Sequence, residues 1–178
     1  MPHAPHLPGF FTAAASVLPV KPLAFLLSRL AASVADGRPG LADRLGTYAG
    51  KTIAVTPADL DLVFLVTFQS GRPAVDVVRA HESWRSDARV SGPLLALIDL
   101  VEGRTDADAL FFSREITIEG DMEAVLALRN ALDAEGLDLM AEAFRPLGPL
   151  AGGMSRAGRN ALQLFRDRLK AHPQEPSA

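Results

Sequence analysis

Residues 115–133 read EITIEGDMEAVLALRNALD, and two different periodicities meet within this stretch. Ile116 and Ile118 alternate with polar residues, which predicts a half-exposed strand. After Gly120, the carboxylate of Asp121 is placed to accept hydrogen bonds from the free amides of a first helical turn. Apolar residues then repeat at helical spacing. The stretch therefore predicts a strand that leads directly into a helix.

Upstream, residues 93–102 predict a helix that is apolar on almost every side. Its apolar surface is a stripe of Leu94, Leu97, Ile98 and Val101, widened by Leu95 and Leu100. A helix of this kind is either buried on several sides or lines a cavity that holds an apolar ligand. The pattern alone favours plain core.

Four further strands are predicted before that helix, at residues 52–56, 60–68, 73–79 and 87–91. The second strand is apolar on both faces, so we expect it in the interior of a sheet. A turn at residues 69–71 makes the second and third strands a hairpin.

Near the N-terminus, helical spacing predicts one apolar face on a helix that ends at residue 36. This face holds Leu23, Leu26, Leu27, Leu30 and Val34, and Phe25 lies on the opposite side. We expect Phe10, Phe11 and Phe25 to be exposed. They would anchor in lipid, join a dimer or cover the entrance of a cavity, and the sequence leaves these three alternatives open.

The last predicted helix, residues 155–170, is basic. It carries Arg156, Arg159, Arg166, Arg168 and Lys170 against the single acid Asp167, a net charge of +4. Such a helix suits an anionic membrane surface, and docking onto the acidic remainder of the chain is an equal alternative. We divide the chain into an N-terminal helical lead (1–36), a central domain (37–145) and a linker with the basic helix (146–178).

The composition excludes several classes of function. The 178 residues carry a net charge of −3, which does not suit a nucleic-acid binder. There is no cysteine, and the four histidines show no ligand-like pairing. Because no P-loop, nucleotide-binding glycine motif or nucleophile elbow is found, we predict no catalytic residue, no metal and no cofactor.

No stretch of the sequence approaches the ~20 apolar residues that cross a bilayer. The N-terminal residues lack a basic cluster and make a poor secretory signal. We therefore expect a cytoplasmic protein whose contact with the inner membrane is peripheral.

Several short segments together resemble a known family. They are Leu110-Phe111-Phe112, the junction Ile116-Thr117-Ile118-Glu119-Gly120-Asp121 and Arg129-Asn130, with PVKPL (19–23), DLDL (59–62) and ARVSG (88–92) upstream. In type and order these resemble the sterol carrier protein 2 superfamily. Within it, the chain is most similar to the bacterial accessory factors of oxygen-independent ubiquinone biosynthesis.

The resemblance implies an α+β fold: a mainly antiparallel mixed sheet of about five strands, covered by helices around an apolar tunnel, with extra helices at both ends. By analogy the tunnel is lined by Phe64, Phe68, Trp84, Leu94, Leu97, Ile98, Phe112, Ile116, Met122, Val125 and Leu126. Any one of these is more often plain core. Arg129 would meet an anionic head group at the tunnel mouth, or else its stem covers apolar surface while its charge reaches water.

The resemblance also implies a non-enzymatic lipid-binding function. Such a protein would bind isoprenoid quinone precursors and present them to partner hydroxylases among the other ubiquinone biosynthesis proteins. Two alternatives stay open: a general carrier of phospholipid or fatty acid, and a small enzyme with a hydrophobic pocket.

Overall fold

The computed structural model describes residues 19–38, 40–69, 72–102, 115–134 and 160. The chain divides into two compact units, Met1–Leu137 and Asp138–Ala178. Every described residue except Asn160 lies in the first unit, so the fold and the site belong to that unit.

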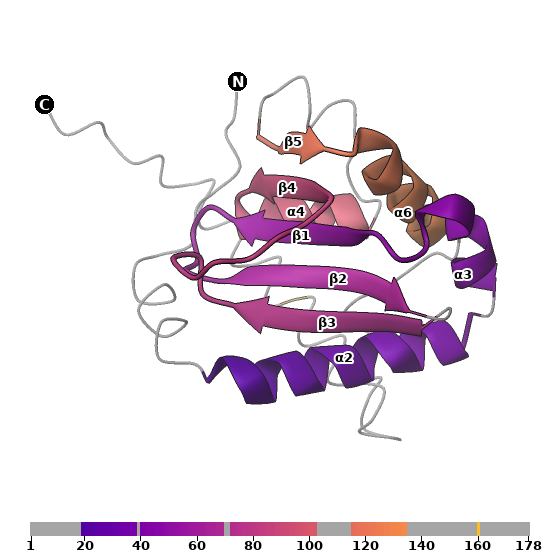
Figure 1. Cartoon of the computed structure of the whole chain (residues 1–178), viewed down its shortest axis with the longest axis horizontal. Coiled ribbons are helices and arrows are strands. Elements are labelled where there is room, and N and C mark those ends of the chain that lie inside the picture. Colours follow the sequence, from indigo (N-terminus) through magenta and orange to yellow (C-terminus); the bar gives the residue numbers. More distant parts are fainter. Residues whose placement is uncertain (1–18, 39, 70–71, 103–114, 135–159, 161–178) are drawn as a thin grey trace, which may run out of the picture. The chain divides into compact units, whose positions relative to one another are not determined.

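Five strands form one mixed sheet in the order β3-β2-β1-β4-β5 (Figure 1). Their bounds are Thr52–Pro57 for β1, Val63–Gln69 for β2, Arg72–Val78 for β3, Ala88–Gly92 for β4 and Thr117–Gly120 for β5. β1 and β4 run parallel, and every other neighbouring pair is antiparallel. The mainly antiparallel mixed sheet, the hairpin of β2 and β3, and the interior position of β2 are all confirmed.

The two faces of this sheet differ in chemistry. One row of paired residues is apolar across all five strands: Val77, Phe64, Val55, Val90 and Ile118. The neighbouring row is Asp76, Leu65, Ala54, Arg89 and Glu119. It points to the opposite face, because successive side chains of a strand alternate. The helices should therefore cover the face of the first row, and they do.

The helices of the described unit are α2 (Val20–Asp36), α3 (Gly40–Leu45), α4 (Leu94–Val101) and α6 (Met122–Ala134), and a 3-10 turn, η1 (Gly46–Tyr48), follows α3. α4 and α6 supply Leu97 and Val125 to a buried cluster over β1 and β4. α3 packs Leu41 and Leu45 around Phe68 of β2. The core therefore lies between the helices and the apolar face of the sheet.

α2 covers the free edge of the sheet at β3 (Figure 1). The hydroxyl of Ser28 donates to the carbonyl oxygen of Val75 at 2.7 Å and accepts from the amide of Val75 at 2.9 Å. Leu23 and Leu27 pack beside Val77. Main-chain groups of an edge strand are ready to pair with another chain, and α2 satisfies those of Val75.

α2 ends at Asp36 as predicted, but the predicted apolar face is wrong at Leu26. Leu26 is 63% exposed, close to the 65% of Phe25. A helix that packs on the edge of a sheet contacts it along a narrow strip, and Leu26 lies at the margin of the apolar stripe. The contact therefore leaves Leu26 out, and α2 turns two large apolar side chains outward.

Candidate functional site

Five of the residues predicted to line a tunnel lie on the helix-covered side of the sheet. Leu97, Ile116 and Val125 are buried together in one cluster. Phe68 belongs to a second cluster with α3, and Phe64 to a third beneath α2. The structure thus brings these residues to one side but divides them among three clusters.

The buried side of α4 coincides with only part of the apolar surface predicted for it. The residues it buries are Leu95, Ala96, Leu97 and Leu100. On its other side Leu94, Ile98 and Val101 are only partly buried. The hydrophobic pattern could not identify the inward side, because the helix is apolar all round. The core therefore uses one side of α4 and leaves an apolar stripe beyond it.

The start of α4 is held by a residue that is distant in the sequence. Oδ1 of Asp59 accepts a hydrogen bond from the amide of Leu94 at 3.0 Å. A first-turn amide has no partner within its own helix, so the carboxylate acts as a cap. Sequence reasoning missed this role because a cap is ordinarily sought just before the helix, where Pro93 stands.

An apolar patch on α6 ends in a guanidinium group. Met122 is 55% exposed and Leu126 is 41% exposed. Arg129 lies on the same side, because residues three and four positions apart are neighbours on a helix. Its Nη2 is 3.3 Å from Oδ2 of Asp133, and its buried Nε has no hydrogen-bond acceptor in the described part of the chain. This arrangement suits an amphipathic ligand with an anionic head.

Trp84 lies apart from the other predicted tunnel residues. It belongs to the segment that joins β3 to β4, and the guanidinium carbon of Arg89 is 4.5 Å from its ring centre. Arg89 is in the row that points away from the helices, where it also pairs with Glu119 at 3.2 Å. The cation–π contact therefore places Trp84 on the opposite face of the sheet.

Several predicted residues lie outside the described part of the chain. They are Phe112 of the tunnel set and Phe10, Phe11, Arg156, Arg159 and Arg166 of the membrane-contact set. Phe25, the remaining member of the membrane-contact set, is exposed on α2.

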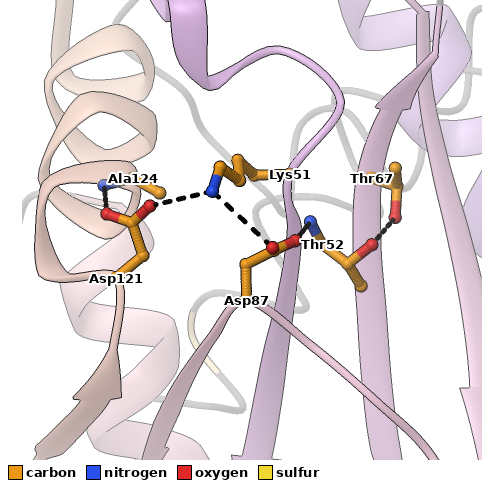
Figure 2. Close-up of polar contacts among 6 residues, drawn as sticks. All are labelled: Lys51, Thr52, Thr67, Asp87, Asp121 and Ala124. Carbon is orange, nitrogen blue, oxygen red and sulfur yellow. Dashed lines mark hydrogen bonds and ion pairs between the residues drawn. The ribbon is translucent and has the colours of Figure 1, made fainter.

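Lys51 joins the strand-to-helix junction to the sheet (Figure 2). Its Nζ lies 3.3 Å from Oδ2 of Asp121 and 3.7 Å from Oδ1 of Asp87. Asp87 Oδ2 accepts from the amide of Thr52 at 2.7 Å, and Asp121 Oδ1 accepts from the amide of Ala124 at 3.0 Å. The cluster thereby ties β1 and β4 to the first turn of α6, and the predicted cap by Asp121 is confirmed.

The charges of this cluster support one another. The side-chain hydrogen bond with Asp121 is the main cause that raises the pKa of Lys51. The pKa of Asp121 is lowered, first by the amide of Ala124 and also by Lys51. Gly120 has φ +80, and a Cβ there would collide with the carbonyl oxygen of Asp87. The junction therefore needs glycine at this position.

The described residues contain neither a metal-binding cluster nor a helix able to span a membrane. No group of three or more His, Cys, Asp or Glu side chains there is arranged to hold a metal ion. No helix there is both long enough and apolar enough to cross a membrane.

Comparison with protein families gives a match to the model of the SCP-2 sterol transfer family over residues 30–133. The chain belongs to the SCP-2 sterol transfer family. The matched stretch of this family member contains the whole sheet, α4 and α6, but residues 20–29 of α2 lie outside it.

This family member also resembles a curated protein from Escherichia coli (strain K12). It is 29% identical to the ubiquinone biosynthesis accessory factor UbiT over 96 residues, which cover 54% of this chain and 52% of that protein. The chain thus spans about half the length of the curated relatives it matches.

A solved structure described as the UbiJ-SCP2 ubiquinone synthesis protein shares the fold. Its TM-score is 0.55 at 22% identity, and the similarity covers 68% of this chain and 98% of that one. The α+β fold of the SCP-2 sterol transfer family, a five-stranded mixed sheet with helices, is therefore confirmed.

Proposed function

We propose that this protein is a non-enzymatic lipid carrier that binds isoprenoid quinone precursors and presents them to hydroxylating partners in ubiquinone biosynthesis. The observation that carries the proposal is the apolar stripe of Leu94, Ile98 and Val101, which is only partly buried and belongs to none of the three clusters of described core residues. Family membership supports lipid binding, and the name of the UbiT relative supports the pathway.

The stripe on α4 and the patch on α6 border the same buried cluster. Ile98 lies beside Leu97 on α4, and Leu126 lies beside Val125 on α6. Leu97 and Val125 belong to one cluster. A lipid tail along these side chains would gain ~0.8 kcal/mol for each methylene removed from water, so a polyprenyl chain is held without covalent chemistry. Phe112 remains a prediction for the same lining.

Arg129 would meet the head of the bound lipid. Its Nη2 is engaged by Asp133, but the donor at its buried Nε is unused in the described part of the chain. A guanidinium at the end of an apolar patch binds a carboxylate or phosphate while the tail lies along the patch. The head would then stay near the surface, where a partner hydroxylase reaches it, and the chemistry belongs to the partner.

Lipid extraction from the purified full chain tests the proposal. Wild type is compared with Ile98→Glu and with Ala80→Glu, a control at an exposed turn position. We expect a polyprenyl phenol or its carboxylated form in wild type and in the control, and none in Ile98→Glu. Phospholipid or fatty acid in its place would favour the general carrier. A protein that is empty and turns over an apolar substrate would favour the enzyme.

A further inference from the structure

The outward side of α2 carries two large apolar residues between two basic ones. Phe25 and Leu26 are 65% and 63% exposed. Lys21 and Arg29 are also exposed, and neither forms an ion pair with another described residue. We call these four residues the outer α2 patch. Single exposed apolar residues are normal on a protein surface, but an adjacent pair between two exposed cations is a different chemical surface.

The patch is held rigidly by the contacts on the other side of α2. Ser28 bonds both main-chain groups of Val75, and Leu23 and Leu27 pack beside Val77. Because these contacts fix the rotation of the helix, Phe25 and Leu26 cannot turn inward without breaking them. The packing of α2 against β3 therefore fixes the outward orientation of the patch.

α2 itself places no acid beside the patch. The acid of α2 is Asp36, at the far end of the helix, where it pairs with Arg72 at 3.2 Å. Lys21, Phe25 and Arg29 are spaced by four residues, so they follow one another along one side of the helix. A cation thus stands one turn before Phe25 and another one turn after it.

We infer that the outer α2 patch docks the protein on an anionic lipid surface. Phe25 and Leu26 enter the boundary between head groups and acyl chains, and Lys21 and Arg29 contact the phosphates. A second copy of this chain fits less well, because a two-fold contact through the same patch brings like charges together. The patch lies within residues 20–29, which precede the stretch that matches the family.

This inference does not depend on the cargo. Docking concerns the outward side of α2, whereas the proposed cargo surface lies on α4 and α6. Vesicle binding measures the first and lipid extraction measures the second, so either proposal can fail while the other stands. Docking would, however, bring a carrier to the membrane from which a long-tailed lipid must be taken.

Flotation of the full chain with vesicles tests the patch. Wild type should bind vesicles of phosphatidylcholine with phosphatidylglycerol and should bind pure phosphatidylcholine far less. Binding to the anionic vesicles should weaken as salt screens the charges. Phe25→Ala with Leu26→Ala, and separately Lys21→Glu with Arg29→Glu, should each reduce binding roughly tenfold or more. The matched control is Arg85→Glu, which reverses an exposed cation away from α2 and should bind as wild type does.

A direct readout separates the patch from any other membrane contact of the chain. In Phe25→Trp, we expect the tryptophan fluorescence, after subtraction of the wild-type signal from Trp84, to shift to shorter wavelength when anionic vesicles are added. Unchanged emission while the protein floats, or wild-type binding by both double variants, would overturn the inference. It would equally be overturned if the apolar double variant converted a dimer to a monomer without loss of vesicle binding, since the patch would then be a self-association surface.

Discussion

α2 and α4 both carry apolar side chains that the core does not use, but in different surroundings. On α2, Phe25 and Leu26 are more than half exposed and stand between the exposed cations Lys21 and Arg29. On α4, Leu94 and Ile98 are only partly exposed, and the helix carries no basic residue. The two helices thus present different surfaces.

The two proposals, for a cargo surface and for a docking surface, rest on this difference. Apolar residues framed by cations suit the boundary of an anionic bilayer, where the charges find phosphates. Apolar residues beside a buried cluster and without cations suit a hydrocarbon tail, which needs removal from water and nothing more. The polar residues around an apolar surface are therefore more informative about its ligand than the apolar residues themselves.

Introducing a carboxylate on either of the two helices should give the largest effect. Ile98→Glu should abolish lipid occupancy, because an unpaired carboxylate against a bound tail costs several kcal/mol. Leu26→Glu should keep the cargo and lose vesicle binding. Both variants are checked for folding by thermal melts before lipid content and flotation are compared. If Ile98→Glu folds normally and still holds its lipid, α4 is not a tail-binding surface.

A smaller effect is expected from Ser28→Ala, which removes both hydrogen bonds to Val75. Leaving a partly buried amide and carbonyl without partners should lower the free energy of unfolding by about 1 to 2 kcal/mol. Because these bonds anchor α2, vesicle binding should also weaken while the bound lipid stays. Ser33→Ala is the matched control on the same helix. Denaturant unfolding measures the change, and equal stability of the two variants would show that Ser28 is not an anchor.

The fold was largely predictable because its signals are local. Alternation at Ile116 and Ile118, the cap at Asp121 and the hairpin pairing of β2 with β3 each depend on residues close in the sequence, and all appear in the structure. The order of the strands across the sheet depends on pairing between distant segments, and it was not predicted; the family resemblance supplied only a mainly antiparallel mixed sheet of about five strands.

The candidate site was less predictable because it depends on orientation. An all-apolar helix such as α4 has no polar side to mark which residues face the sheet. Of the apolar surface predicted for it, only Leu95, Leu97 and Leu100 lie on the buried side. Lys51, Asp59 and Asp87 were missed because each acts on a segment far from it in the sequence. Trp84 was expected beside the helices, but its contact with Arg89 places it across the sheet.

Arg129→Ala sharpens the comparison at the cargo surface. Removing the guanidinium should weaken the binding of lipids with anionic heads roughly tenfold, about 1.4 kcal/mol. The binding of neutral lipids should stay unchanged, since the apolar contacts remain. Arg129→Lys should restore part of the affinity. Competition between a polyprenyl phenol and its carboxylated form measures the change. Equal loss for both lipids would mean that Arg129 only supports the packing of α6.

The smallest effect concerns the cluster of Lys51, Asp87 and Asp121, which ties the first turn of α6 to β1 and β4. Because the pKa of Asp121 is lowered in the folded chain, its charge stabilises the fold at pH values above its ordinary value of about 4. That contribution is lost as pH falls through the lowered value, because the folded form must then also bind the proton. Asp121→Asn keeps a capping oxygen but not the charge. The Tm of this variant should therefore lie below that of wild type at neutral pH, and the two should converge as the solution becomes acidic.

Asp43→Asn, at an exposed acid of α3, provides the control. A gap in Tm that stays constant down to the most acidic buffer would show that the cap, rather than the charge beside Lys51, holds the junction.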